Sequence, residues 1–158
     1  MRFCLLIIVA SALLSSCDKA RVFEFDHDFT DRTWKVKDIA VFEFEIVDSA
    51  TSYNVYYRIR NSSDYPYSRI FVNYTLQNSA KAELAKKLIS NYLFDQKTGM
   101  PLGSSGIGDA FDHQFLLLPK YKFNQAGKYT IMLEQFMRTD TLRGIEAAGI
   151  RVEKVEVN

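Results

Sequence analysis

One cysteine near the amino terminus stands in a context that specifies covalent chemistry. Cys17 follows Leu14-Ser15-Ser16, which is a large aliphatic residue and two small ones. This order resembles the bacterial lipobox, in which the cysteine thiol receives a diacylglycerol before the preceding segment is cleaved. Three acyl chains would hold the chain on a membrane almost permanently, whereas one myristoyl-length chain binds only marginally. We expect lipidation at Cys17; the alternative is a secreted or cytosolic protein with a chance cysteine.

The segment before Cys17 has the polarity order of a secretory signal. Arg2 provides a basic start, and an apolar run follows it as far as Leu14. This run is shorter than the roughly 20 residues of a membrane-spanning helix, so residues 1–16 are expected to be a cleaved signal peptide. Residues 17–25 would then be the lipidated cysteine and a short tether.

Two aspartates and a histidine lie close together in a glycine-rich stretch. Asp109, Asp112 and His113 have the types needed for a weak cation site, or for a base and its orienting partner. The alternative is that both aspartates cap turns, as short acidic side chains often do in such loops. We favour turn capping, and we expect no metal, no cofactor and no catalytic residue here.

Two further patterns superficially suggest enzymes. Residues 103–108 read Gly-Ser-Ser-Gly-Ile-Gly, but neither a lysine nor a helix signal follows, so a hairpin connection is favoured over a phosphate-binding loop. A serine hydrolase would need a Gly-x-Ser-x-Gly motif, which the sequence lacks. Glu43 and Glu45 have the types of a glycosidase pair, but acids that alternate along a strand usually form its solvated side. We expect a non-enzymatic protein.

Tyrosine and arginine are concentrated between residues 56 and 69. These side chains anchor many protein interfaces, and tyrosine rings also stack on sugars. The alternative is that they pack along a sheet and pair with Glu43 or Glu45. Both interpretations stay open, and the candidate interaction surface consists of Tyr56, Arg58, Arg60, Tyr65, Tyr67 and Arg69.

Composition excludes several classes of protein. The full chain has 20 Lys and Arg against 19 Asp and Glu, and removal of the signal takes away Arg2 and makes the domain formally neutral. A neutral domain has no basic field that would hold nucleic acid by charge. Cys4 leaves with the signal and Cys17 would be consumed by lipidation, so neither disulfides nor thiolate zinc sites are expected.

Alternation of apolar and polar residues predicts antiparallel strands along most of the chain. The pattern is clear in four segments, residues 40–46, 53–60, 69–77 and 129–134. Shorter or less regular strand candidates are residues 22–26, 114–118, 121–123 and 150–157, the middle two separated by Pro119.

One segment departs from this pattern. Apolar residues between 80 and 92 recur at helical spacing, so one short helix is expected there. The total of about seven or eight strands joined by polar turns predicts a mainly β protein, with a single antiparallel β-sandwich over residues 26–158. Its outline would be immunoglobulin-like or jelly-roll-like.

Five segments of the chain together carry a resemblance. They are the lipobox at Cys17, residues 57–67 (Tyr-Arg-Ile-Arg-Asn-Ser-Ser-Asp-Tyr-Pro-Tyr), the glycine-rich run 99–109, Gly127-Lys128-Tyr129, and residues 135–145. These segments are similar to a known family, the gliding-motility lipoprotein GldH family. The resemblance implies a role in the cell-envelope machinery for gliding over surfaces. It implies neither an enzymatic activity nor catalytic residues.

These observations lead to one expectation and one alternative. We expect a non-enzymatic lipoprotein in the bacterial cell envelope, anchored by lipid to the outer membrane, facing the periplasm, with envelope proteins as partners. The alternative is an envelope lipoprotein that binds a glycan or a peptide through the tyrosine and arginine surface.

Overall fold

The structure, a computed structural model, describes residues 20–156, and this part of the chain consists almost entirely of β-strands. Cys17 and the signal segment lie outside the described residues. The elements, in chain order, are β1 (Arg21–Asp28), η2 (Thr30–Arg32, a short 3-10 helix), β2 (Thr33–Lys35), β3 (Ala40–Ile46), β4 (Tyr53–Ser62), β5 (Arg69–Asn78), β6 (Glu83–Tyr92), β7 (Ser104–Ser105), β8 (Ala110–Tyr121), β9 (Gly127–Gln135), β10 (Thr141–Arg143) and β11 (Ile145–Lys154).

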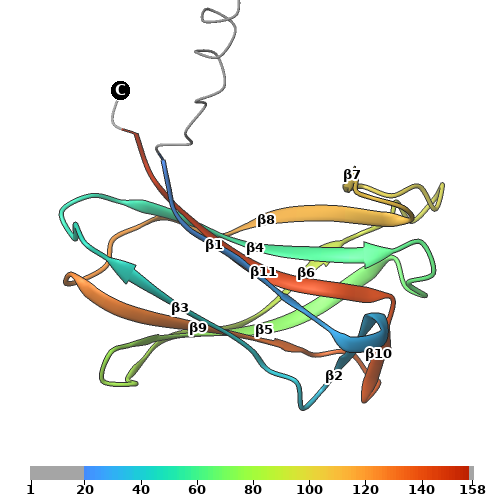
Figure 1. Cartoon of the computed structure of the whole chain (residues 1–158), viewed down its shortest axis with the longest axis horizontal. Coiled ribbons are helices and arrows are strands. Elements are labelled where there is room, and N and C mark those ends of the chain that lie inside the picture. Colours follow the sequence, from blue (N-terminus) through green and yellow to red (C-terminus); the bar gives the residue numbers. More distant parts are fainter. Residues whose placement is uncertain (1–19, 157–158) are drawn as a thin grey trace, which may run out of the picture.

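The strands form two main sheets that pack face to face, as Figure 1 shows, and this confirms the predicted antiparallel β-sandwich. One sheet has the order β1-β11-β4-β8-β7 and the other the order β3-β9-β5-β6. A two-stranded ribbon, β10-β2, closes one end. All strand pairs are antiparallel, and the chain changes sheet between β4 and β5.

The core between the sheets follows directly from the alternation in the sequence. In β3, every second residue from Ala40 to Ile46 is buried and those between are exposed, because successive side chains of a strand point to opposite faces. Aromatic contacts join the two sheets: the ring centroids of Phe23 and Phe44 are 5.8 Å apart. The buried Tyr57 hydroxyl on β4 also donates a hydrogen bond to the Asn91 side chain on β6.

The helix predicted over residues 80–92 is wrong, because this segment is the edge strand β6. Ala85 and Ile89 face the core opposite Leu76 and Val72 of β5. A spacing of four residues places two side chains on the same side of a helix and also on the same side of a strand. The strand is favoured here because its apolar side completes the sandwich core beside β5.

Three boundaries also differ from the predictions. Strand β1 confirms the strand candidate 22–26, but it begins at Arg21 and pairs with β11 from there, so it takes in the end of the range expected to be the tether. Residues 110–121 form one strand that runs through Pro119. Proline has no N–H to donate, and β8 tolerates it because no strand pairs with this part of β8 on the side away from β4. The last strand begins at Ile145 rather than at Ile150, because it already pairs there with Asn61 of β4.

Candidate interaction surfaces

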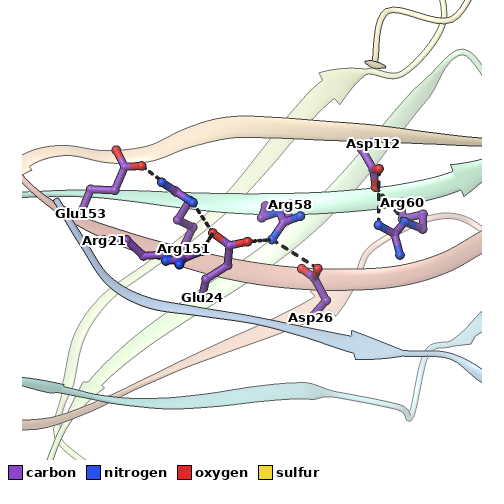
Figure 2. A network of polar contacts seen from close by, with 8 residues as sticks. All are labelled: Arg21, Glu24, Asp26, Arg58, Arg60, Asp112, Arg151 and Glu153. Atoms are coloured by element: carbon purple, nitrogen blue, oxygen red, sulfur yellow. Dashed lines mark hydrogen bonds and ion pairs between the residues drawn. The ribbon is translucent and has the colours of Figure 1, made fainter. Parts of the chain in front are cut away.

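The first half of the predicted tyrosine and arginine surface lies on the outer face of the five-stranded sheet. Tyr56, Arg58 and Arg60 occupy alternate positions of β4 and point away from the core. Figure 2 shows the ionic contacts around them, which we call the charged face: Arg21, Glu24, Asp26, Arg58, Arg60, Asp112, Arg151 and Glu153.

Arg58 is tied to two carboxylates on a strand that is not its neighbour. One of its terminal nitrogens lies 2.6 Å from Glu24 Oε1 and 3.3 Å from Asp26 Oδ2, both on β1. Strand β11 separates β4 from β1, and its residue between Arg58 and Asp26 is Gly149. A Cβ atom on Gly149 would lie 1.8 Å from Asp26 Oδ1, so this glycine makes room for the ion pairs above the strand.

The carboxylates of the charged face respond differently to these surroundings. Partial burial pushes the pKa of Glu24 upward, but the hydrogen bond from Arg151 and the charges of Arg58 and Arg21 outweigh it, so the pKa is lowered. Burial dominates at Asp26 and raises its pKa despite the charge of Arg58. The predicted pairing of these arginines with Glu43 or Glu45 does not occur, because those acids are exposed on the other sheet.

Asp109, Asp112 and His113 do not form a site together. Asp112 accepts a hydrogen bond of 2.7 Å from Arg60 Nε, and Asp109 accepts one of 3.0 Å from Arg32. The hydrogen bond from Arg32 is the largest influence that lowers the pKa of Asp109. Within residues 20–156, no group of three or more His, Cys, Asp and Glu side chains is placed to hold a metal ion.

His113 points to the opposite side of β8 from Asp112 and is buried. Its ring stacks on Phe115 with 5.8 Å between centroids, and Nε2 has no hydrogen-bond partner. Burial of the ring lowers its pKa to about 4. Gly103 passes so close that a Cβ atom there would lie 2.7 Å from Nε2, so the glycine-rich run serves as a packed hairpin connection against β8.

The second half of the predicted surface lies elsewhere, because β5 belongs to the four-stranded sheet. Tyr65 is buried in the connection that changes sheet, and its hydroxyl donates a 3.0 Å hydrogen bond to the Arg69 carbonyl. Tyr67 is 44% exposed. Arg69 points outward from β5, so the six residues do not form one surface: three lie on the outer face of the five-stranded sheet, Tyr67 and Arg69 lie beside the four-stranded sheet, and Tyr65 is buried.

An apolar groove lies beside Arg69 on the outer face of the four-stranded sheet. Its volume is about 460 Å³, and its lining residues, which define what we call the distal groove, are Tyr67, Phe71, Leu88, Phe136, Met137 and Arg138. These residues come from β5, β6 and the segments that precede β5 and follow β9. The groove is therefore built across the sheet from segments that are distant in sequence.

A buried glutamine shapes the segment that follows β9. Gln135 is 1% exposed, its Nε2 donates a 2.9 Å hydrogen bond to the Thr139 carbonyl, and its Oε1 accepts a 2.8 Å hydrogen bond from Met137 N–H. The Phe136 N–H donates to the Phe71 carbonyl at 2.9 Å, which holds the segment against β5. The groove wall is thus fixed by internal hydrogen bonds while the Phe136 ring stays 57% exposed.

The sequence pattern indicated Tyr67 as an interaction residue but not the apolar side chains around it. Phe71 stands at a position that faces outward in β5, so it breaks the alternation of its own strand. Leu88 was assigned to the apolar side of the expected helix. Outward apolar residues of this kind are a usable signal, because an isolated strand has no structural need for them.

Comparison with known proteins identifies the family. A family model described as GldH lipoprotein matches residues 21–152. The chain belongs to the GldH lipoprotein family. The Gliding motility lipoprotein GldH homolog of Christiangramia forsetii is 31% identical over 149 residues, covering 90% of this chain and 89% of that protein. The Gliding motility lipoprotein GldH of Flavobacterium johnsoniae is 25% identical over 156 residues, covering 94% of each.

Solved structures add only a remote likeness to this GldH family member. The structure of the infectious bursal disease virus VP2 subviral particle aligns with a TM-score of 0.45 and 11% sequence identity. The alignment covers 86% of this chain and 33% of the VP2 chain. Similarity at this level carries no functional information. Among the helices of residues 20–156, none has the length and apolar character needed to cross a membrane.

Proposed function

We propose that this GldH family member is a non-enzymatic component of the gliding-motility machinery, tethered through lipid on Cys17 to the outer membrane and facing the periplasm. The observation that carries the proposal is the match to the GldH lipoprotein family over residues 21–152. A second observation is the lipobox sequence that ends at Cys17, a few residues before the matched region begins. The two relatives are named as gliding motility lipoproteins, and this chain aligns with nearly the whole length of each.

The start of the domain is compatible with a short tether. Three residues separate Cys17 from Arg21, where β1 begins, so the cysteine lies within about 14 Å of the strand even if the chain is fully extended. The Lys154 N–H donates a 2.7 Å hydrogen bond to the Ala20 carbonyl, which ties the start of the domain to the end of β11. A lipid on Cys17 would therefore turn this end of the sandwich toward the membrane.

The contacts of the polar groups support a non-enzymatic role. Asp112 and Asp109 are each bound to an arginine, and His113 is buried against Phe115. A general acid or base must reach its substrate, and these groups are instead used in packing and ion pairs. The alternative of one glycan site across all six tyrosines and arginines lacks a contiguous surface, since the two halves lie on opposite sheets.

Labelling with a fatty acid tests the anchor. The wild-type protein, expressed in its native host, should incorporate labelled palmitate and sediment with membranes, and Cys17→Ala should lose the label. Equal labelling of both proteins would overturn the lipoprotein assignment. For the role in motility, cells with the gene deleted should spread less on agar, and the wild-type gene should restore spreading better than the Cys17→Ala gene. Unchanged spreading of the deletion strain would overturn that part.

A further inference from the structure

The distal groove is open, apolar and already shaped. Within it, Leu88 is 44% exposed and Phe136 is 57% exposed, so two large apolar side chains of one groove face solvent. The hydrogen bonds of Gln135 fix the segment that carries Phe136, so little ordering would be needed on binding. Rigid aromatic and aliphatic walls around a groove are typical of sites that receive a partner's side chain.

Two arginines beside the groove have no carboxylate partner among residues 20–156. The Arg69 guanidinium carbon lies 4.6 Å from the centre of the Tyr92 ring and 5.3 Å from that of Phe71, and its Nε is buried without a hydrogen-bond acceptor. Arg138 is exposed and lines the groove. Arginines held on aromatic rings keep donors free for a carboxylate, and a charged hydrogen bond of this kind is stronger than a neutral one. Glu134, which faces outward on the neighbouring part of β9, forms no ion pair with either arginine.

The groove lies at the end of the sandwich opposite to the start of β1, which follows the segment that would carry the lipid. Residues 47–52 join β3 to β4, so Ile46 and Tyr53 lie at the same end of the sandwich as Arg21 and Lys154. The groove lies at the other end, where β5 begins and β9 ends. A strand of eight residues spans about 26 Å, so the length of β1 separates the groove from the end of the sandwich at which Arg21 lies.

The edge of the sheet favours a polypeptide over a glycan or a lipid. Strand β6, which contributes Leu88 to the groove, pairs only with β5 among residues 20–156, so no other strand of this part of the chain covers its outer edge. An extended peptide can add to such an edge through main-chain hydrogen bonds while its alternate side chains enter pockets on one face. The site therefore combines a backbone edge, an apolar groove and two unpaired cations.

We propose that the distal groove binds an extended segment of a partner protein, with an aliphatic or aromatic side chain in the groove and an Asp or Glu nearby in the segment paired with Arg69 or Arg138. This inference names a surface that the proposed function leaves unassigned. It does not depend on Cys17, because the described residues that line the groove come from β5, β6 and the segments beside β5 and β9.

A peptide selection tests the proposal. The full-length protein in phosphatidylcholine nanodiscs is panned against a phage library of random linear 12-residue peptides, and the best peptide is measured by fluorescence polarisation. The selected peptides should share an apolar residue with an Asp or Glu within two positions. Peptides without a common acidic residue, or no selection above empty nanodiscs, would overturn the proposal.

Matched variants place the binding in the groove. Leu88→Ser and Arg138→Ala should each weaken binding of the selected peptide at least tenfold. Leu84→Ser is the control for Leu88→Ser, because Leu84 faces the same side of β6 with 37% exposure but does not line the groove. Equal effects of Leu84→Ser and Leu88→Ser would contradict the assignment of binding to the groove. The proposal would also be overturned if the wild-type protein without peptide used the groove to bind anionic lipid or a second copy of itself.

The anchor and the groove can fail independently. Cys17→Ala should bind the selected peptide as tightly as the lipidated protein, with the detergent-free buffer and salt kept constant. If palmitate labelling fails but the peptide still binds through Leu88, only the proposed anchor is lost. Loss of peptide binding in correctly lipidated protein overturns only the groove assignment.

Discussion

The two outer faces of the sandwich use arginine in opposite ways. On the five-stranded sheet, Arg58 lies between Glu24 and Asp26 and its side chain is only 21% exposed. On the four-stranded sheet, Arg69 is held on aromatic rings and Arg138 extends beside an apolar groove, with neither in an ion pair among the described residues. Paired charges complete the protein's own surface, whereas unpaired charges beside exposed apolar side chains leave a surface that a partner can complete.

The difference arises from the size of the residues that lie between the charges. On the charged face, the small residues Gly149 and Ala147 of β11 leave room, so Arg58 of β4 reaches carboxylates of β1 over the intervening strand. On the other face, Phe71 of β5 is large and faces outward, and the Arg69 guanidinium carbon lies 5.3 Å from the centre of its ring. Small residues thus permit ion pairs across a sheet, and large aromatic residues build a groove.

Filling the room above Gly149 should break the charged face. In Gly149→Ala, the new Cβ would lie 1.8 Å from Asp26 Oδ1 and 2.8 Å from the Phe25 carbonyl oxygen, so β1 must shift. We expect the free energy of unfolding to fall by about 3 kcal/mol, the upper part of the range for overpacking. Urea unfolding followed by circular dichroism measures it. The double variant with Asp26→Ala should recover part of the loss, and a full loss in the double variant would contradict this account.

Removing one arginine from each face tests the comparison directly. Arg58→Met should lower the free energy of unfolding by about 2 kcal/mol, because Glu24 and Asp26 lose a partner while they stay partly buried. Arg138→Met should change it by less than about 0.5 kcal/mol, because Arg138 is exposed and forms no ion pair in the described part of the chain. Thermal unfolding of both variants against wild type provides the measurement. Equal losses would mean that the two faces do not differ as described.

Acidification should act first inside the sandwich, at His113. Because burial lowers its pKa from 6.5 to about 4, the unfolded chain binds more protons than the folded chain between these values. The free energy of unfolding should therefore rise with pH over this window, and wild type should lose about 2 kcal/mol between pH 7 and pH 4.5.

His113→Phe provides the control for this pH dependence. The variant should remove most of the pH dependence between about pH 7 and about pH 4.5. Glu24 does not replace it, because its pKa is lowered and its contribution to stability is therefore lost only at lower pH. Asp26 acts in the opposite direction, because its raised pKa favours the folded state as the pH falls through that pKa. Parallel urea titrations of wild type and variant at both pH values measure the difference. An unchanged slope in the variant would exclude His113 as the main cause.

The sequence predicted the interior well because the interior obeys a local rule. A strand turns successive side chains to opposite faces, so the alternation in residues 40–46, 53–60, 69–77 and 129–134 was sufficient to predict strands and a sandwich. The same reasoning failed at 80–92, since the four-residue spacing of Ala85 and Ile89 suits a helix and a strand equally. It also divided residues 110–121 at Pro119, because an open strand edge cannot be recognised from local sequence.

By itself, the sequence determined the alternating strands, the similarity to the GldH lipoprotein family and the proposed chemistry of Cys17, since each depends on neighbouring residues. Only the tertiary structure decided what the tyrosines and arginines between 56 and 69 do. The chain changes sheet after β4, so residues adjacent in sequence separate to opposite faces. The carboxylates that pair with Arg58 come from β1, which is distant in sequence, whereas Arg69 lies against Tyr92 of β6 and forms no ion pair among residues 20–156.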